Sequence, residues 1–366
     1  MRSNVIPPQD ELEAIGYDKA EVEKLVTFGK ALNPIKEPLR RGELGRQLLR
    51  KLWPDELEFI SKAHWIKTKV PGQKVLLEPN YAQKRFYKEV IEHCREEGMP
   101  IRGIILKARQ LGFSTFIQSW QYEQCDRGSL RGSMTVSYDD ESTKELFQKA
   151  KMIHDNLWFP RTTDRDSRGQ LAFDNGSSFF TRTAGNLNLG RSQTIHHAHC
   201  SEVPMWPDAG EALTSLGDAI PLQPGTSIFY ESTAKGAYGE FYEDWSDAEA
   251  GKSNFVPFFA PWFWDEEYQI AFPDEDRKRA FGRSLGVKDR KYMARHHLTL
   301  EQMRWRAAKI ADARGNVRRF QQENPADPME AFLTTGSPCF DPELVSELAS
   351  NATEPFWSGD IVLKDR

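Results

Sequence analysis

The sequence is poor in cysteine and has no long apolar run. Its 366 residues include four cysteines, none in a Cys-x-x-Cys pair, which disfavours both a zinc site and a disulfide framework and favours a reducing compartment. No uninterrupted apolar stretch approaches the ~20 residues of a membrane-spanning helix, and the N-terminus, MRSNVIPPQDELEAIG, has no apolar segment typical of an export signal. We therefore expect a chain that neither crosses a membrane nor enters the export route, with its cysteines in the core.

Lysine and arginine, 49 in all, are slightly fewer than the 54 acids, but many of them lie in one segment. The formal net charge is −5, which does not indicate a nucleic-acid binder. Between Arg277 and Arg319, however, fourteen lysines and arginines face three acids, so this segment carries +11 and the remainder −16. The asymmetry favours a cationic face for an anionic partner, either DNA phosphates or an acidic surface of a neighbouring subunit. The alternative is a pair of solvated basic helices, and Thr299 with Gln302 predicts a capping box that begins one of them.

Apolar runs rich in β-branched and aromatic residues recur along the middle of the chain. The first begins at Ile101, and four more follow it. These four lie at Ser133–Tyr138, Ser178–Thr183, Thr194–Cys200 and Thr226–Glu231. Helical patterns such as Gln83–Glu96 and Asp140–Leu157 lie before and between them. The alternation predicts the α/β class, with a mainly parallel sheet flanked by helices.

The pattern changes toward both ends, which predicts four parts. Residues 1–75 are polar and mostly helical in pattern, so we expect a helical N-terminal extension with a basic helix near Leu39–Leu52. Residues 76–255 form the α/β core. Residues 256–335 turn first aromatic and then helical and basic, which predicts a small lid-like subdomain beside the sheet. Residues 336–366 are predicted to form a linker.

The segment 101–115, IRGIILKARQLGFST, reads as a buried strand, a loop and the start of a helix. Aligned on Gly112, it fits the phosphate-loop pattern G-x-x-x-x-G-K-[ST] only in part. Lys107 stands where the first glycine belongs, Phe113 where the lysine belongs, and Ser114 at the hydroxyl position. The lysine of the pattern is therefore displaced to the front of the loop.

A loop between a strand and a helix N-terminus can hold polyphosphate whichever side the cation enters from. Its backbone N–H groups and the positive end of the helix dipole provide the anion site. Lys107 and Arg109 would supply charge, and Ser114 or Thr115 the hydroxyl on the Mg²⁺ side. The alternative is an ordinary turn and helix cap with two solvated basic residues nearby.

Glu202 follows the fourth run, in TIHHAHCSEVPMW. A glutamate that a strand end delivers beside a phosphate loop can polarise an attacking water, while a neighbouring group holds the water shell of Mg²⁺. Ser201 occupies the position where an aspartate is usual; its hydroxyl can bond a metal-bound water but brings no charge. The alternative is a surface glutamate after an edge strand. For the histidines at 196, 197 and 199 we expect structural roles rather than a metal site, because 196 points away from the other two in a strand.

A tract of small polar residues closes the next strand. Ser232, Thr233 and Ala234 follow Glu231 in GTSIFYESTAKG. Small polar groups at this place can sense a γ-phosphate and relay its loss. Such a tract is common in proteins. It supports a nucleotide site only because it follows the phosphate loop and the Glu202 segment in the chain.

Four motifs therefore follow one another along the chain. Gln83 in LEPNYAQKRF comes first, then KARQLGFST, SEVPMW and ESTAKG, and the chain continues to ENPADPMEAFLTTGSPCFD. This order, with a lysine at the front of the phosphate loop, resembles the ATPase domain of the large terminase subunit of tailed bacteriophages, the motor that pumps DNA into procapsids. The resemblance covers roughly Leu76 to Asp341.

The resemblance implies a P-loop nucleotide site for ATP. Gln83 matches the adenine-reading glutamine, with Tyr81 or Phe86 able to pack on the base. The match to the Walker A loop comprises Lys107, Ala108, Arg109, Gln110, Leu111, Gly112, Phe113, Ser114 and Thr115.

The resemblance also implies the chemistry of a Mg²⁺-dependent ATP hydrolase. Glu202 matches the catalytic glutamate of Walker B, and Lys107 and Arg109 are expected to stabilise phosphate charge. Mg²⁺ is expected at Ser114, Ser201 and Glu202, partly through water. The coupling motif is matched by Ser232, Thr233 and Ala234.

Members of this family supply an arginine to the active site of the next subunit from the segment just before Walker B. In GNLNLGRSQT the matching residue is Arg191, with Arg182 as the second candidate. Such an arginine neutralises charge on the transferring phosphoryl group; the alternative for Arg191 is a brace within its own subunit.

The partners implied by the resemblance are double-stranded DNA held through its backbone, a portal protein and a small terminase subunit. Self-assembly into a ring on the portal, in the cytoplasm of the host cell, follows from the same resemblance, with a monomeric state of the isolated domain left open.

Large terminase subunits usually continue into an RNase-H-like nuclease with clustered acids. After the linker-like stretch Thr335–Glu354 too little sequence remains for that domain, so we expect no DNA cleavage by these residues. Two other functions remain open. One is a helicase-like nucleic-acid translocase, disfavoured because no second half with its own arginine motif follows Glu231. The other is a non-catalytic, nucleotide-dependent module that docks on a portal or small subunit.

Overall fold

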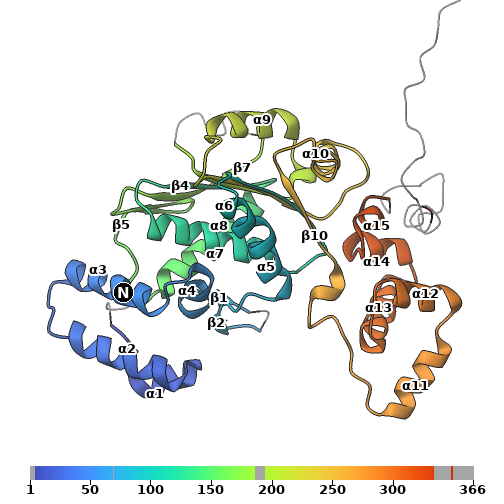
Figure 1. Ribbon diagram of the computed structural model, residues 1–366, viewed down its shortest axis with the longest axis horizontal. Coiled ribbons are helices and arrows are strands. Elements are labelled where there is room, and N and C mark those ends of the chain that lie inside the picture. The colour runs from blue at the N-terminus through green and yellow to red at the C-terminus, as the bar shows by residue number, and fades with distance from the viewer. Residues whose placement is uncertain (1–4, 69, 186–193, 334–347, 349–366) are drawn as a thin grey trace, which may run out of the picture.

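The computed structural model describes residues 5–68, 70–185, 194–333 and 348. A sheet flanked by helices lies at its centre (Figure 1). The sheet has eight strands in the order β10-β3-β9-β8-β4-β7-β6-β5. The strands are β3 (Ile101–Lys107), β4 (Gly132–Ser137), β5 (Thr163–Ser167), β6 (Gln170–Phe173), β7 (Ser178–Thr183), β8 (His197–Ser201), β9 (Ser227–Ser232) and β10 (Val256–Ala260). The six strands from β10 to β7 are parallel, whereas β6 and β5 run antiparallel at one edge. The predicted α/β class with a mainly parallel sheet is confirmed.

Helices cover both faces of the sheet because its central strands are apolar on both sides. On β3, Ile105 contributes to the core beneath the helices α5 (Tyr81–Phe86) and α7 (Phe113–Arg127). Its neighbours Ile104 and Leu106 point to the opposite face, which the helices α9 (Ala209–Ala219) and α10 (Glu240–Glu249) cover (Figure 1). This two-residue alternation is the pleat of the strand.

Two helices predicted from the sequence are present in the structure. The helix predicted over Gln83–Glu96 is present as α5, a π-helical stretch (Tyr87–Glu92) and α6 (His93–Glu96). The helix predicted over Asp140–Leu157 is α8 (Asp140–Asn156). The other short elements are the hairpin β1 (Trp65–Lys67) and β2 (Lys74–Leu76) and the 3-10 turns Val203–Met205 and Trp262–Trp264.

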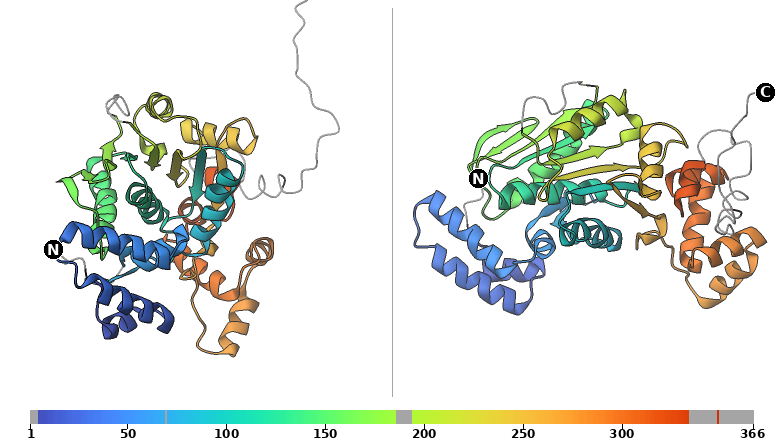
Figure 2. Two further views of the ribbon diagram at one scale, coloured as in Figure 1. Left: turned by 60° about the vertical axis from the view of Figure 1, so that its left-hand side comes forward. Right: turned by 45° about the horizontal axis from the view of Figure 1, so that its top comes forward.

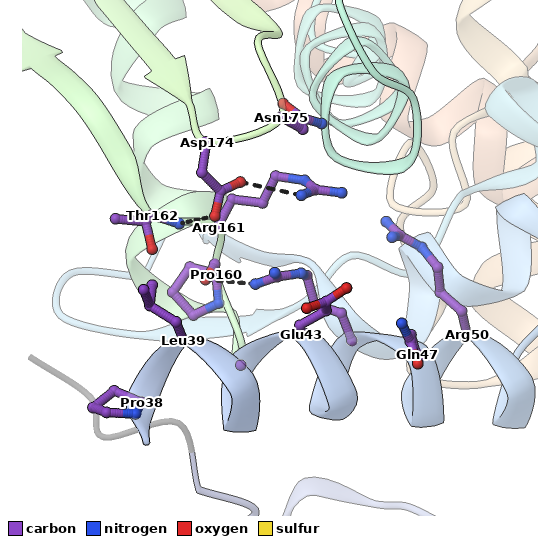
Figure 3. A pocket seen from close by; sticks show the side chains of 12 residues that line it. Pro38, Leu39, Glu43, Gln47, Arg50, Pro160, Arg161, Thr162, Asp174 and Asn175 are labelled. Carbon is purple, nitrogen blue, oxygen red and sulfur yellow. Dashed lines mark hydrogen bonds and ion pairs between the residues drawn. The ribbon is translucent and has the colours of Figure 1, made fainter.

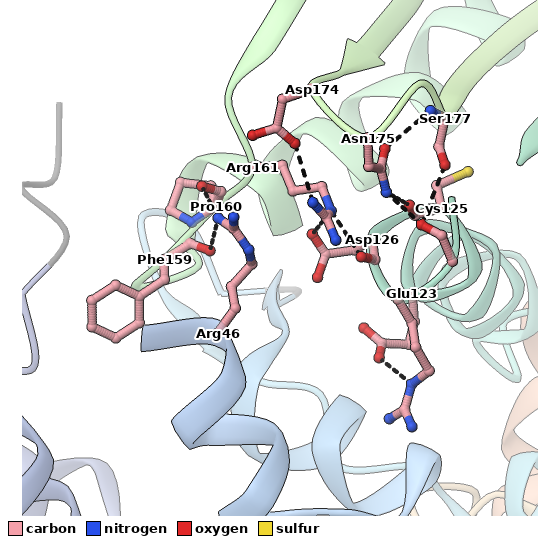
Figure 4. Close-up of polar contacts among 12 residues, drawn as sticks. Arg46, Glu123, Cys125, Asp126, Phe159, Pro160, Arg161, Asp174, Asn175 and Ser177 are labelled. Atoms are coloured by element: carbon pink, nitrogen blue, oxygen red, sulfur yellow. Dashed lines mark hydrogen bonds and ion pairs between the residues drawn. The ribbon is translucent and has the colours of Figure 1, made fainter. Parts of the chain in front are cut away.

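The predicted N-terminal extension consists of four helices that pack on one side of the core (Figure 2). They are α1 (Gln9–Ile15), α2 (Lys19–Leu32), α3 (Pro38–Leu52) and α4 (Glu56–Ala63). The contact with the core runs along α3, where Gly45 lies against the ring of Phe159. Arg46 donates to the carbonyl oxygens of Phe159 and Pro160 at 3.5 and 3.1 Å (Figure 4).

Ion pairs complete this contact. Arg50 on α3 pairs with Asp126 of α7 at 2.5 Å and with Glu123 at 3.3 Å. Arg161 pairs with Asp126 and with Asp174 at 3.3 and 3.1 Å (Figure 4). Between α3 and these core residues lies a pocket of about 560 Å³, which Figure 3 shows from the side of the helix. Arg46 and Arg50 of α3 thus attach the extension to the core.

The C-terminal helices form a subdomain on the other side of the core (Figures 1 and 2). They are α11 (Glu275–Ser284), α12 (Val287–Arg295), α13 (Leu300–Asp312), α14 (Val317–Glu323) and α15 (Pro328–Leu333). The ring of Trp305 stacks between Trp262 and Tyr268, with centroids 5.1 and 4.2 Å away. The capping box predicted at Thr299 and Gln302 is confirmed.

Two predictions about this region need adjustment. The predicted core ended at residue 255, but β10 (Val256–Ala260) pairs with β3 and belongs to the central sheet. Part of the basic segment is used inside the subdomain, since Arg306 is buried and pairs with Asp289 at 3.0 Å, and Lys278 pairs with Glu301 at 2.8 Å. Apart from Leu348, residues 336–366 lie outside the described part of the chain.

Among the described residues, none of the helices is long and apolar enough to span a bilayer.

The contact of α3 with the core yields a stability prediction. A Cβ added at Gly45 would approach the Phe159 ring to 2.5 Å, so Gly45→Ala is expected to destabilise the protein by about 1–3 kcal/mol through overpacking. The control is Gly217→Ala on α9, where nothing lies within 4 Å of an added Cβ and the loss of glycine flexibility stabilises a helix by up to ~1 kcal/mol. Urea unfolding measures both. Equal stability of the two variants would contradict this account of the docking.

Candidate active site

Three neighbouring parallel strands deliver polar residues to one edge of the sheet. Lys107 ends β3, Glu231 and Ser232 end β9, and Ser201 and Glu202 lie at the end of β8. In the sheet order β9 lies between β3 and β8. Because the carboxyl ends of parallel strands share an edge, the motifs that are separate in the sequence meet there.

The loop after β3 turns sharply into α7. Gln110 and Gly112 adopt positive φ angles of 60° and 74°, and α7 begins at Phe113 directly after Gly112. The first turn of α7 therefore points its N–H groups and its positive dipole end toward this edge of the sheet. The N–H groups at the front of the loop are already used, since Ala108 donates to Ala260 at 3.0 Å and Arg109 to Glu323 at 2.9 Å. An anion would therefore bind to the N–H groups in the later part of the loop.

Lys107 lies at the centre of the site. Its side chain is only 8 % exposed, and its Nζ lies 3.3 Å from Glu231 and 4.0 Å from Glu202. Burial acts to lower the pKa of Lys107, but the two carboxylates outweigh it and hold the pKa above its ordinary value. The lysine is therefore a fixed positive charge directed at the strand ends.

Glu231 contacts four polar side chains, those of Lys107, Ser114, His199 and Ser201. Ser114 donates to its two carboxylate oxygens at 2.9 and 3.1 Å, and Ser201 donates at 3.3 Å. His199 contacts it through Nε2 at 3.0 Å while Gln118 occupies the other ring nitrogen. The side chain is fully buried, which opposes ionisation, yet Lys107 and the hydrogen bond of His199 hold the pKa of Glu231 well below its ordinary value.

Glu202 occupies a strained position at the end of β8. Its φ of 56° lies in the left-handed region, which is unfavourable for a residue with a side chain and often occurs at functional sites. Ser232 donates to its carboxylate at 3.0 Å. Partial burial raises the pKa of Glu202, Lys107 opposes this shift, and the negative charge of Glu231 adds to it. About one third of the side chain, 33 %, remains exposed, so it can reach a water molecule.

The residues expected near Mg²⁺ are brought together in part. Ser114, on the first turn of α7, and Ser201, on β8, both donate to the carboxylate of Glu231. Thr115 is half-buried beside Ser114. Hydroxyl and carboxylate oxygens are the ligand types that Mg²⁺ prefers, so this donor set fits that ion.

Gln83 braces the phosphate loop. It is buried, its amide donates to the carbonyl oxygen of Leu111 at 3.3 Å, and its amide oxygen accepts from the N–H of Asn80 at 3.0 Å. A Cβ on Gly112 would lie 2.6 Å from the Gln83 amide nitrogen, which explains the glycine there. Tyr81 is 48 % exposed and makes an edge contact with Trp264.

Two side chains named with the nucleotide site belong to the core. Phe113 and Phe86 are buried and pack edge to face at 5.7 Å. Phe86 is therefore unavailable to a base, and Phe113 can contribute only its backbone N–H. Leu111 and Ala108 are likewise buried.

Of the arginines expected at the active site, the structure describes Arg109 and Arg182. Arg109 is ion-paired with Glu323 of α14, and its carbonyl oxygen accepts from Tyr268 at 3.0 Å. These residues line a cavity of about 400 Å³ between the loop and the C-terminal subdomain. Arg182 donates to its neighbouring carbonyl oxygen, of Thr181, at 2.9 Å and covers the Phe180 ring. Arg191 lies outside the described residues.

The coupling tract divides into distinct roles. Ser232 contacts Glu202 directly, as described above. Ala234 is buried in the core beneath α9 and α10, and Thr233 is half-buried. Within this tract Ser232 contacts Glu202 through its side chain, and the preceding residue of β9, Glu231, accepts a hydrogen bond from the N–H of Glu202 at 2.8 Å.

Sequence reasoning did not assign a role to Glu231. The available signal was a charged residue at the end of an otherwise apolar strand, one position before Ser232. What the sequence does not state is the register, in which Glu231 lies opposite Ser201 on β8 and beside Ile105 on β3. In this register Glu231 lies beside Ser201, the position at which an aspartate is usual.

The three histidines each hydrogen-bond a neighbouring residue. His197 hydrogen-bonds Ser227 at 3.0 Å, His199 contacts Glu231, and His196 accepts from the N–H of Gly132 at 3.0 Å. In the part of the chain that the structure describes, no group of three or more His, Cys, Asp or Glu side chains could hold a metal ion.

The buried ion pair yields a second stability prediction. Lys107→Met would leave Glu231 without its main counter-charge, so a loss of about 3–5 kcal/mol is expected. The double variant Lys107→Met/Glu231→Gln should lose less than the sum of the two single losses, because it removes both charges. Lys144→Met, at an exposed position of α8, serves as the control and should change stability by less than about 0.5 kcal/mol. Strictly additive losses in urea unfolding would show that the pair is not coupled.

Solved structures similar to this chain include large terminases of three bacteriophages. The HK97 large terminase shares 15 % sequence identity over 74 % of this chain and 54 % of its own, with a TM-score of 0.49. The ATPase domain of the Thermus phage P74-26 large terminase shares 16 % over 69 % and 99 %, with a TM-score of 0.39. The large terminase of another thermophilic bacteriophage, in complex with ADP, shares 13 % over 51 % and 46 %, with a TM-score of 0.37. This chain spans about half the length of the HK97 protein and of the protein in the ADP complex. No protein-family model and no curated protein sequence matches it.

Proposed function

We propose that this chain is the ATPase motor domain of a phage large terminase subunit, which hydrolyses Mg-ATP to move double-stranded DNA into a procapsid. The observation that carries the proposal is the meeting of Lys107, Ser114 and Glu202 at one sheet edge beside the N-terminus of α7. A cation, a hydroxyl and a partly exposed carboxylate at a helix N-terminus are the groups that phosphoryl transfer to water requires.

Each residue has a separate task in this proposal. The first turn of α7 and Lys107 bind the β- and γ-phosphates and stabilise the charge that develops on them. Glu202 accepts a proton from the attacking water, a role that suits its raised pKa. Mg²⁺, when bound with ATP at Ser114, neutralises phosphate charge. Ser232 senses the state of the site through its hydrogen bond to Glu202.

The DNA-binding part of the proposal rests on charge. The segment from Arg277 to Arg319 carries +11, and although Arg306 and Lys278 are paired internally, Arg314 and Arg318 lie exposed near α14. Glu323 of the same helix contacts Arg109 of the phosphate loop. Binding of DNA phosphates to this subdomain would therefore be felt at the loop.

Substitution of Glu202 tests the catalytic assignment. Glu202→Gln keeps the shape of the side chain but removes its capacity to accept a proton, so steady-state ATP hydrolysis should fall by about 10²–10⁴-fold. Binding of Mg-ATP should remain, because the phosphate contacts are unchanged. Glu145→Gln, an exposed acid of α8, is the control and should hydrolyse ATP at the parental rate. Unchanged hydrolysis by Glu202→Gln would refute the assignment.

Charge reversal tests the DNA-binding part separately. Arg314→Glu/Arg318→Glu should reduce the stimulation of ATP hydrolysis by duplex DNA and lower the salt slope of DNA binding by about 1 for each phosphate that the variant no longer neutralises. Hydrolysis without DNA should be unaffected. Lys144→Glu on α8 is the matched reversal elsewhere on the surface. If the double variant keeps full stimulation and the parental salt slope, DNA does not bind at this face.

A further inference from the structure

The carboxylate that is missing at position 201 reappears one strand away. Ser201 on β8 and Glu231 on β9 are direct cross-strand partners in the sheet, and Ser201 donates to the Glu231 carboxylate at 3.3 Å. Glu231 also approaches the phosphate-loop strand β3, where its register partner is Ile105. An acid on β9 therefore occupies the space between the β8 strand end and the loop.

The hydrogen bond from Ser114 gives this acid a specific effect. A serine hydroxyl has one hydrogen and two lone pairs. Because Ser114 donates its hydrogen to Glu231, at 2.9 and 3.1 Å from the two carboxylate oxygens, its lone pairs are directed away from Glu231. A hydroxyl held in this way presents an acceptor to a cation at the N-terminus of α7.

The charge of Glu231 is also well placed. The side chain is fully buried, and among the ion pairs of the described residues Lys107, at 3.3 Å, is the only lysine or arginine paired with it. Ser201 contributes no charge, and Glu202 lies farther from Lys107, at 4.0 Å. Glu231 is therefore the buried negative charge nearest to the Ser114 hydroxyl.

We propose that Glu231 is the metal-side carboxylate of this site. It orients the Ser114 hydroxyl toward the Mg²⁺ of bound Mg-ATP and supplies the negative charge that Ser201 lacks, whereas Glu202 keeps the water-activating role. Glu231 acts through Ser114 and is thus a positioning residue. The inference rests on the proposed function, namely that this edge of the sheet binds Mg-ATP.

If Glu231 served only as the ion-pair partner of Lys107, its substitution would give a different result. In that case its removal would change the affinity for nucleotide whether or not a divalent cation is present. If Glu231 positions the metal-binding hydroxyl, its removal weakens binding of the cation to the nucleotide complex and changes metal-free nucleotide binding little.

The test measures Mn²⁺ binding by electron paramagnetic resonance, using the 366-residue chain saturated with the non-hydrolysable ATP analogue AMP-PNP. Glu231→Gln should lower the Mn²⁺ affinity by about 10–100-fold, the usual effect of removing a group that orients a metal ligand. Its affinity for AMP-PNP in EDTA should change by a smaller factor than its Mn²⁺ affinity, because the group that orients the metal-binding hydroxyl acts only when the cation is bound. Unchanged Mn²⁺ affinity, or an equal loss of AMP-PNP affinity with and without Mn²⁺, would overturn the inference.

A second variant moves the carboxylate to the other strand. Ser201→Asp/Glu231→Gln places an acid at the expected position on β8, so it should recover most of the lost Mn²⁺ affinity. It also keeps the number of acids at these strand ends unchanged, so the test stays valid if Glu231→Gln alone folds poorly. Lack of recovery in the folded double variant would count against the inference.

The same measurements separate failure of the proposed function from failure of the inference. If the parent chain itself binds no AMP-PNP, the proposed function fails. If the parent binds Mn²⁺ and AMP-PNP and Glu231→Gln binds both equally well, only the role of Glu231 fails.

Discussion

The buried ion pair between Lys107 and Glu231 is the interaction on which the rest of the site depends. Each charge would be costly alone in the interior, and each is stabilised by the other across 3.3 Å. The pair joins β3 to β9, and the remaining lone pairs of the carboxylate accept from Ser114 on α7 and Ser201 on β8. One buried charge pair thereby fixes the relative positions of the phosphate loop, the helix that follows it and the two neighbouring strand ends.

This arrangement explains why the lysine stands at the front of the loop. The position that usually carries lysine holds Phe113, whose ring packs into the core against Phe86 and Phe258. A lysine at position 113 would lose this aromatic packing. Placed at the end of β3, Lys107 instead reaches the carboxylates of Glu231 and Glu202. The surroundings of these two carboxylates differ. Glu231 is fully buried and held ionised, whereas Glu202 is partly exposed, strained in its backbone and has a raised pKa. Two carboxylates with such different surroundings are suited to different tasks.

The sequence predicted those features that depend on local pattern. The apolar run from Ile101, the turn at Gly112 and the alternation of strands and helices predict the sheet and its phosphate loop because they reflect pleat, backbone conformation and periodicity. Features that depend on the order and register of the strands could not be predicted from the sequence. The contacts of Glu231 require knowing that β9 lies between β3 and β8, and the antiparallel strands β5 and β6 are short and partly exposed. Phe86 was assigned to the nucleotide by its place in a motif, but its ring is buried in the aromatic core. Arg109 forms an ion pair with Glu323, and its contact with the nucleotide stays a prediction.

The central claim is that Lys107, Ser114, Glu202 and Glu231 form one phosphate- and metal-binding site. A crystal structure of this chain with Mg²⁺ and AMP-PNP tests it most directly. The account predicts that Lys107 contacts the β- and γ-phosphates, that the Ser114 hydroxyl ligates Mg²⁺ while it still donates to Glu231, and that Glu202 faces a water near the γ-phosphate. A nucleotide bound elsewhere, or bound here with Arg109 on the γ-phosphate and Lys107 still paired away from it, would contradict the account.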